Sequence, residues 1–256
     1  YQPVIDIGTG RTAAYEALVR WDHPERGLLG PDEFLGIAEE TGLIVQMGEF
    51  VIRRALSEMA AWKGDFRISI NLSPSQIRSV DLLPTIAEAI AETGIDPHRI
   101  EFEITEHVIL QSDDTAAATL SRLRAMGVKI ALDDFGTGYS SLSYLRRFPF
   151  DRIKIDRSFV KDLTTSASAR AIVSTVIALG RSLGMEVTAE GVEDRTQLHI
   201  LNELGCDEAQ GYLILEPVAA PELDRARADL GADRDDGVLD YAAAREAILR
   251  RRKQAS

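Results

Sequence analysis

Two adjacent carboxylates stand directly after an apolar segment near the middle of the chain. Within residues 128–142 (VKIALDDFGTGYSSL), the apolar run 128–132 leads straight into Asp133 and Asp134. Successive strand side chains point to opposite sides, so both carboxylates reach one site only where the strand ends and the backbone turns. Burying two anions costs several kcal/mol each unless a partner neutralises them, and a divalent cation is such a partner. The pair therefore indicates a metal site, although a solvated acidic turn shows the same local pattern.

Polar residues also interrupt six other apolar segments with strand character. Most of them lie at or near the carboxyl end of the segment: Glu16, Asn71, Glu103, Lys154, Glu190 and Gln210. Any one of these residues could be structural. Seven strands that each deliver such a residue to one rim are typical of a site, and several carboxylates with a carboxamide and one lysine describe an oxygen-lined centre for two metal ions. Centres of this kind align a water molecule for in-line attack on phosphorus and polarise the attacking and leaving oxygens.

The composition favours a hard metal ion. The chain has four histidines, which form no metal-binding pattern, and its single cysteine, Cys206, excludes a cysteine-rich zinc site. Oxygen ligands favour Mg²⁺ or Mn²⁺. We expect Ca²⁺, which is larger and binds more loosely, to occupy the site but to be inhibitory.

The spacing of apolar segments predicts the elements that position these residues. We expect strands over residues 1–6, 12–21, 66–72, 99–105, 128–132, 151–155, 186–190 and 208–213. Helices are expected over 31–40, 44–62, 81–93, 113–126, 141–148, 166–183 and 195–204, and from 221 onward. This alternation is the rhythm of a parallel sheet, and seven or eight such units close a β/α barrel. In that fold the carboxyl ends of the strands form the face where chemistry takes place.

Charge and hydropathy bound the functional class. The chain of 256 residues is 45% hydrophobic, with a formal net charge of -12 and a mean hydropathy of -0.08. An acidic surface argues against binding a nucleic-acid polymer, but bound metal ions can reverse the local field for a small phosphorylated ligand. No apolar run approaches a membrane span and no signal peptide opens the chain, so a cytoplasmic location without membrane contact is expected. Because the first residue is Tyr1, we expect a piece of a longer protein.

The last 26 residues differ from the rest of the chain. The segment ADRDDG reads as a linker, and residues 238–252 read as a helix that ends in a basic run. The run is either a solvated helix end that complements the helix dipole or part of a docking helix. We therefore divide the chain into a barrel over residues 1–230 and a linker with a helical extension over 231–256.

Seven motifs, in this order, carry a family resemblance that one tripeptide alone would not. They are Glu16-Ala17-Leu18, Asn71-Leu72-Ser73-Pro74, Glu103-Ile104-Thr105-Glu106, the stretch from Asp133 to Leu142, Lys154-Ile155-Asp156, Ala189-Glu190-Gly191-Val192-Glu193 and Gln210-Gly211-Tyr212. Together with Gln2-Pro3-Val4, they resemble the EAL domain family of cyclic-di-GMP phosphodiesterases over about residues 1–223. The resemblance implies an α/β fold, a TIM-like (β/α)8 barrel with its first strand antiparallel. The implied activity is metal-dependent hydrolysis of one phosphodiester bond of cyclic di-GMP to linear pGpG by a metal-activated water, in bacterial second-messenger signalling.

The resemblance also implies a role for each motif residue. Glu16, Asn71, Glu103 and Asp133 would hold one metal; Asp133 would bridge to a second, which Asp134 also holds, with Glu190 nearby through water. Lys154 would orient the attacking water and oppose charge on the phosphate, and Glu190 is the candidate general base. The catalytic set is then Lys154, Glu190 and Glu16. Arg20 and Gln2 would contact the phosphate and guanine ends of the substrate, and Gln210 and Glu193 would order the site.

Regulation and assembly also follow from the resemblance. Glu106 would anchor the loop after Asp134, and this loop with the helix after it would form a homodimer interface. An upstream sensor or GGDEF cyclase domain is expected in the full-length chain. One departure is Glu216, where the family usually has a basic residue before a proline, so the charge near the rim is reversed.

Other functional classes remain open at this point. A catalytically silent receptor for cyclic di-GMP typically loses the first-motif Glu, an Asp of the pair or the Lys, and this chain keeps all of them. An inert dimerisation scaffold has no use for a carboxylate cluster. The Asp-Phe-Gly tripeptide occurs in kinases, but the chain lacks their His-Arg-Asp loop. A different metalloenzyme of the barrel class is the remaining alternative.

Overall fold

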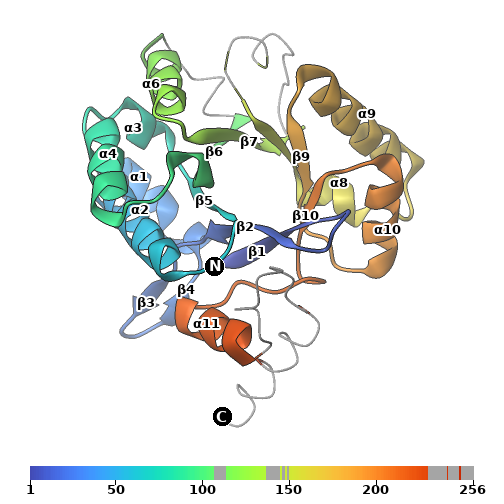
Figure 1. Cartoon of the computed structure of the whole chain (residues 1–256), viewed down its shortest axis with the longest axis horizontal. Coiled ribbons are helices and arrows are strands. Elements are labelled where there is room, and N and C mark those ends of the chain that lie inside the picture. The colour runs from blue at the N-terminus through green and yellow to red at the C-terminus, as the bar shows by residue number, and fades with distance from the viewer. Residues whose placement is uncertain are drawn as a thin grey trace.

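Eight strands close into one barrel in the computed structural model, which describes residues 1–106, 114–136, 145, 148, 150–229, 241 and 248. Around the barrel the strands follow the order β1–β10–β9–β8–β7–β6–β5–β2 (Figure 1). They are β1 (Gln2–Asp6), β2 (Thr12–Ala17), β5 (Arg67–Asn71), β6 (Ile100–Thr105), β7 (Lys129–Phe135), β8 (Arg152–Ile155), β9 (Glu186–Ala189) and β10 (Glu208–Gln210). The predicted TIM-like barrel is confirmed.

The first strand runs against all the others. β1 pairs antiparallel with both β2 and β10, whereas the remaining neighbours pair in parallel. A tight turn makes this reversal: the Asp6 carboxylate accepts a 2.7 Å hydrogen bond from the Thr9 backbone, and Gly10 takes a φ of 71°. Glycine adopts such a φ without steric cost. As a result, the start of β1 lies at the same rim as the ends of the other strands.

Helices fill most connections and surround the barrel (Figure 1). They are α1 (Leu35–Thr41), α2 (Leu43–Ala61), α3 (Pro74–Arg78), α4 (Leu82–Thr93), α6 (Asp114–Ala125), α8 (Arg157–Lys161), α9 (Ala167–Leu183), α10 (Arg195–Leu204) and α11 (Ala220–Asp229), with 3₁₀ turns at Pro31–Glu33 and Pro97–Arg99. Local signals set their ends. Asp194 accepts hydrogen bonds from two backbone N–H groups at the start of α10, and Gly205 ends that helix in the left-handed conformation.

The two faces of each strand differ in character. Outward side chains such as Ile70, Phe102 and Ile153 are at most 1% exposed and belong to the apolar core between strands and helices. Inward side chains at the alternate positions include Glu101, Glu103 and other buried polar residues. Barrels of this class usually fill their interior with branched apolar residues. The polar interior of this barrel therefore needs an explanation from its chemistry.

Some elements differ from the sequence-based prediction. The strand expected over 12–21 ends at Ala17, and a separate two-stranded sheet forms from β3 (Trp21–His23) and β4 (Gly27–Leu29). The strand expected over 208–213 ends at Gln210. A Cβ on Gly211 would lie 2.2 Å from the Val192 backbone, so the chain makes a close approach there instead of continuing the strand. The short helix α8 was not predicted.

Several predictions concern residues that the structure does not describe. The helix over 141–148, the linker after 230, the loop beyond Gly136 and its dimer contact lie largely or wholly outside the described residues. From the tail, Tyr241 and Ile248 are described, and both are buried at 8% and 4% exposure. The Tyr241 and Thr12 hydroxyls are hydrogen-bonded to each other. Within the described part of the chain, no helix has the length and apolar character that a membrane crossing requires.

Candidate active site

The predicted polar residues meet at one rim of the barrel. Alternation along each strand turns them inward, and the parallel arrangement brings the carboxyl ends together. We call this set the rim cluster; it comprises Glu16 on β2, Asn71 on β5, Glu103 on β6, Asp133 on β7, Lys154 on β8, Glu190 after β9 and Gln210 on β10. Gln2 joins them from the start of the antiparallel strand β1, where it pairs with Glu16.

Lys154 lies at the centre of the rim cluster and is 2% exposed. Its Nζ lies 2.6 Å from Glu190 Oε1, 3.3 Å from Asp133 Oδ1 and 3.8 Å from Glu16 Oε2. It also donates to Glu103 in a direct ion pair. Four carboxylates, three from strands and one from the loop after β9, thus surround a single ammonium group.

Amide side chains hold Glu16 from the other side. Asn71 Nδ2 donates to one oxygen of Glu16 and Gln210 Nε2 to the other, each at 2.7 Å. Gln210 also donates to Gln2 Oε1 at 3.0 Å, and Gln2 donates to the Leu215 carbonyl at 3.0 Å. Burial favours a higher pKa for the Glu16 carboxyl, but Lys154 and these amide donors outweigh it and lower that pKa. Gln2 is buried within this network.

Lys154 supplies one positive charge to four neighbouring carboxyl groups, and two of them, Glu103 and Glu190, have raised pKa values. Burial raises the pKa of Glu190 to about 8, and Asp133 and Glu16 add to this rise while Lys154 opposes it. Burial and the same neighbouring carboxylates raise the pKa of Glu103 well above its ordinary value. Burial alone would lower the pKa of Lys154, but the surrounding acids raise it, so the ammonium form persists at neutral pH.

The Asp-Asp pair lies within the last three residues of β7, where the strand is irregular. Asp134 has a φ of 55°, and among the described residues it is the single non-glycine residue in the left-handed region. Its backbone N–H donates to Asp133 Oδ1 at 3.0 Å. The strand was expected to end at residue 132, but it continues to Phe135, and its register with β8 shifts at the pair. This irregularity in the strand, and not a strand end, brings both carboxylates to one place. Burial, Asp133 and Asp156 raise the pKa of Asp134.

The donors of the rim cluster fit a divalent metal. Oxygen atoms of Asp133, Asp134 and Glu190 lie within 4.8 Å of one another. All the candidate ligand atoms are oxygens, the donors that Mg²⁺, Mn²⁺ and Ca²⁺ prefer. Gln210 Oε1 is buried without a hydrogen-bond partner. Four carboxylates around one ammonium leave an excess of negative charge, which bound cations would neutralise.

A cavity of about 310 Å³ opens above this cluster. Its floor includes Glu16, Asp133 and Glu190, and its walls carry two exposed arginines, Arg20 and Arg157. Two cations over an anionic floor suit a ligand that has both phosphate groups and metal-binding oxygens. The cavity is therefore the candidate active site.

Comparison with known proteins agrees with this geometry. A family model described as EAL domain matches residues 1–217. The chain belongs to the EAL domain family. Two curated relatives from Pseudomonas aeruginosa are the bifunctional diguanylate cyclase/cyclic di-GMP phosphodiesterase MucR, 42% identical over 227 residues, and the cyclic di-GMP phosphodiesterase NbdA, 40% identical over 228. These matches cover 87% and 88% of this chain but only 33% and 29% of the relatives.

Solved EAL structures share the fold. The c-di-GMP complex of the PaMucR phosphodiesterase is 42% identical, with a TM-score of 0.83 over 87% of this chain and 92% of that one. The manganese/cy-diGMP complex of BlrP1 from Klebsiella pneumoniae is 32% identical, with a TM-score of 0.77 over 86% of this chain and 55% of that one.

The structure places the remaining predicted residues at the edge of this EAL domain's site. All four predicted substrate-binding residues line the cavity: Gln2, Arg20, Glu193 and Gln210. Glu106 accepts a 3.4 Å hydrogen bond from the Gly136 backbone through Oε2, so it contacts the start of the loop that follows Asp134. The contact is consistent with the anchoring role, which stays a prediction because the loop beyond Gly136 is not described.

Sequence reasoning missed part of the cavity wall. Arg157, Tyr212 and Pro217 line the cavity, and Tyr212 is 52% exposed. Arg157 comes three residues after Lys154, at the start of the unpredicted helix α8. The sequence does show an arginine two residues after the end of β8, the strand that holds Lys154. Whether its side chain points into the cavity depends on where helix α8 begins, which the sequence did not predict.

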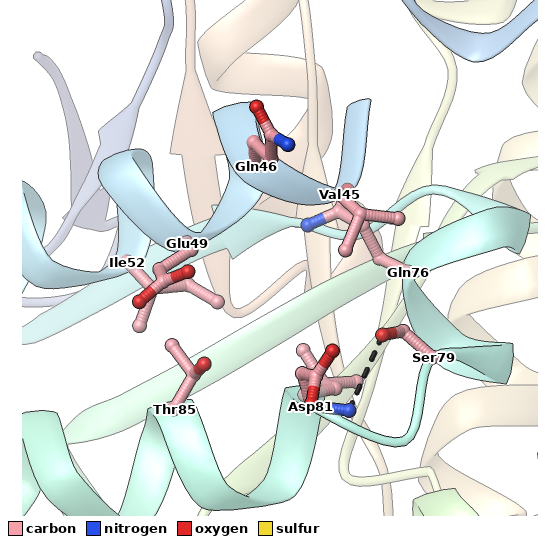
Figure 2. A pocket seen from close by; sticks show the side chains of 9 residues that line it. Val45, Gln46, Glu49, Ile52, Gln76, Ser79, Asp81 and Thr85 are labelled. Atoms are coloured by element: carbon pink, nitrogen blue, oxygen red, sulfur yellow. Dashed lines mark hydrogen bonds between the residues drawn. The ribbon is translucent and has the colours of Figure 1, made fainter. Parts of the chain in front are cut away.

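A second cavity lies outside the barrel of this EAL domain, near α2, α3 and α4 (Figure 2). It measures about 120 Å³ and is lined by residues that include Glu49, Gln76 and Asp81. Asp81 donates its backbone N–H to Ser79 Oγ at 3.3 Å. Its lining holds no lysine or arginine to pair with the acids. It therefore lacks the charged constellation of the rim and is not a candidate for the same chemistry.

Proposed function

We propose that this EAL domain hydrolyses one phosphodiester bond of cyclic di-GMP and releases linear pGpG. The observation that carries the proposal is the complete rim cluster, in which four carboxylates at the carboxyl ends of the strands surround the ammonium of Lys154. The curated names of MucR and NbdA, and the c-di-GMP complex of PaMucR, support the substrate class. A receptor would need neither this lysine nor so costly a group of buried acids.

Two divalent cations complete the proposed site. Glu16, Asn71, Glu103, Asp133, Asp134 and Glu190 would hold them, and their oxygen donors suit Mg²⁺ or Mn²⁺. When bound, the cations would supply Lewis-acid activation of the water and of the phosphate oxygens. The manganese complex of BlrP1 supports this metal class.

Lys154 provides a fixed positive charge at the point of reaction. Its ammonium group has no freedom to leave, because it is 2% exposed and held by acids on several sides. A charge fixed in a water-poor site stabilises negative charge as it develops on the phosphate. It acts more strongly on the transition state than on the ground state, and so accelerates the reaction.

Glu190 is the proposed proton acceptor for the attacking water. It is the most accessible of the acids that contact Lys154, with a side-chain exposure of 19%, and it lines the cavity. A general base works best when its pKa lies near the working pH. Burial and neighbouring acids move the pKa of Glu190 into that range.

The cavity walls would bind the rest of the substrate. Arg20 and Arg157 are both exposed at the cavity, where they can donate hydrogen bonds to phosphate oxygens. Neither arginine forms an ion pair with a described acidic residue. Gln2 lines the same cavity and accepts a hydrogen bond from Gln210, so it would contact the substrate beside Gln210.

The relatives support a role for this domain within a larger protein. The chain spans 33% of MucR, whose name includes a diguanylate cyclase activity. We propose that a sensor or GGDEF domain accompanies the EAL domain, and that a second copy contacts the loop after Asp134. Light scattering of the purified chain would test the dimer.

Product analysis tests the proposed activity. The purified chain is incubated with cyclic di-GMP in Mn²⁺, in Ca²⁺ and in excess chelator, and the nucleotides are separated by chromatography. We expect pGpG in Mn²⁺ and little or none in Ca²⁺ or chelator. If cyclic di-GMP stays intact but binds to the chain by calorimetry, the domain is a receptor. Full activity in chelator, after metal removal has been verified, would contradict the role of the metal ions.

A further inference from the structure

A second set of charged residues fills the barrel beneath the rim cluster. We call it the lower charged layer; it comprises Arg67, Ser69, Glu101, Arg152, Thr188 and Glu208. Except for Arg67, which lies deeper on β5, each member precedes a rim residue by two positions: Ser69 and Asn71, Glu101 and Glu103, Arg152 and Lys154, Thr188 and Glu190, Glu208 and Gln210. A two-residue step keeps side chains on the same face of a strand. The rim cluster therefore stands directly on the lower charged layer.

Arg152 is the centre of this layer and is 2% exposed. Its guanidinium donates from Nε to Glu101 at 3.0 Å, and Nη1 lies 3.1 Å from Thr188 Oγ1 and 2.8 Å from Glu208 Oε2. Glu101 and Glu208 belong to β6 and β10, which are not neighbours of β8. One side chain thus links strands on both sides of its own, and the small Ala131 on β7 leaves the space for this contact.

The lower charged layer neutralises itself, unlike the rim cluster. Two arginines face two buried glutamates, and Arg67 adds a 2.8 Å ion pair to Glu208. Arg152 also pairs with Glu186 at 2.5 Å, but that side chain is 53% exposed and its charge is solvated. Ser69 and Thr188 donate further hydrogen bonds to Glu101 and Glu208, at 2.9 and 3.2 Å. Among the buried members no excess charge remains to attract a cation. The layer is therefore not a second metal site.

Buried ion pairs of this kind are seldom explained by stability. Well-packed apolar side chains of similar volume often serve stability equally well or better. Charge-assisted hydrogen bonds, however, fix direction and distance in a way that apolar packing does not. The advantage of these ion pairs is therefore that they fix geometry. The groups that need exact placement are those of the rim cluster, two residues further along the same strands.

The decisive relation is between two parallel ion pairs. Arg152 pairs with Glu101, and two residues further along the same two strands Lys154 pairs with Glu103. We propose that Arg152 is a positioning residue: by locking β8 to β6 and β10, it sets where Lys154 and Glu103 lie in the rim cluster. This inference rests on the proposed function for its catalytic consequence, and it also predicts an effect on metal affinity.

The test must avoid leaving a buried charge without a partner. The double variant Arg152→Met/Glu101→Gln removes one charge of each sign, retains the Arg67–Glu208 pair, and leaves an oxygen for Ser69 to donate to. Arg152→Lys is the second variant; it keeps the charge but lacks the fork that reaches several partners at once. Arg99→Met is the matched control, because Arg99 donates to the carbonyls of Phe66 and Gly64 away from the barrel interior.

Three quantities are measured for each variant: melting temperature, kcat and KM for cyclic di-GMP well below that temperature, and Mn²⁺ affinity by calorimetry. A displacement of about 1 Å at a reacting centre costs about 10²-fold in rate. Loss of the groups that orient metal ligands costs about 10–100-fold in affinity. We expect losses of these sizes in the double variant while it stays folded, and neither loss in Arg99→Met.

A folded double variant with wild-type kcat and Mn²⁺ affinity would overturn the positioning role and leave the proposed function intact. If the double variant does not fold, the same comparison is decided by Arg152→Lys. If the wild-type chain hydrolyses no cyclic di-GMP, the proposed function fails, and Mn²⁺ affinity alone decides the positioning role: an unchanged affinity in the variants contradicts it.

Discussion

At the scale of single residues, the rim cluster lowers the stability of the metal-free fold and in return places the groups that the reaction needs. Lys154 contacts four carboxylates, and the pKa of Glu190 is raised to about 8 because burial and its neighbours disfavour the ionised form. Groups arranged for catalysis commonly cost stability, since the fold must hold them where water is scarce. Two measurements on the metal-free protein follow from this excess of negative charge.

Removing one carboxylate should stabilise the metal-free protein. Asp133→Asn keeps an oxygen for the Asp134 N–H but removes a negative charge from a cluster that has too many. We expect the melting temperature in chelator to rise by about 2–4 °C, the shift that ~1 kcal/mol produces in a domain of this size. Hydrolysis should be abolished. Asp65→Asn, at an exposed turn, is the control and should change neither. A fall in the melting temperature of Asp133→Asn would show that the cluster is not overcharged.

The stability of the metal-free protein should fall as the pH rises. The Glu190 carboxyl has a pKa of about 8 in the folded chain, against 4.5 as its ordinary value. Between these values the folded chain keeps a proton that the unfolded chain releases, so the stabilisation is full below about pH 4.5 and is lost through pH 8. The pKa of Glu101, lowered to about 2 against burial by Arg152 and Arg67, affects stability only at lower pH.

Calorimetric melting in chelator from pH 5 to 8 checks this prediction. We expect a decreasing melting temperature for the wild-type chain and a flatter profile for Glu190→Gln. A melting temperature that rises over this range in chelator would contradict the assignment of a raised pKa to the rim cluster.

At the scale of elements, two helices begin alike but face different surroundings. α8 begins at Arg157 after the cap Asp156, and α10 begins at Arg195 after the cap Asp194. Arg157 lines the cavity above the rim cluster, whereas Arg195 lines an outer groove beside β1. The close approach of Arg157 to Gly191, where a Cβ would lie 2.5 Å away, holds the start of α8 against the loop after β9. Helix α8 thus gives the cavity a cation from outside the barrel.

Replacement of these two arginines separates substrate binding from helix stability. Arg157→Ala should raise KM for cyclic di-GMP about tenfold, because a hydrogen bond to a charged group contributes about 1.5–3 kcal/mol. Arg195→Ala makes the same change at the same helix position and should leave KM unaltered. Steady-state kinetics on both variants supplies the comparison. Equal KM values for the two variants would exclude Arg157 from substrate binding.

At the scale of the whole molecule, the barrel could be predicted from the sequence because its signals are local. Apolar strands alternate with helices that have clear stops, such as Gly184 and Gly205, and these signals survive in a single sequence. The rim residues could be predicted for the same reason. Each lies near the end of a strand, and parallel strands bring those ends together.

What could not be predicted depends on contacts between distant segments. The short strands β3 and β4 have only three residues each, too few for a periodic pattern. Arg152, Glu101 and Glu208 belong to the interior of the barrel, but a polar residue early in a strand has no local sign of its partner. Their common role is visible only in the folded structure, where Arg152 forms ion pairs with Glu101, 51 residues before it, and with Glu208, 56 residues after it.

The central claim is that the ammonium at the centre of the barrel acts on the transition state, and Lys154→Met tests it most directly. This substitution keeps the apolar stem and removes the charge, so cyclic di-GMP should still bind, measured by calorimetry in Ca²⁺. Turnover in Mn²⁺, measured by chromatography of pGpG, should fall about 10²–10³-fold, as is typical when one such electrostatic group is lost. A folded variant that turns over at the wild-type rate, or one that no longer binds the nucleotide, would contradict the account.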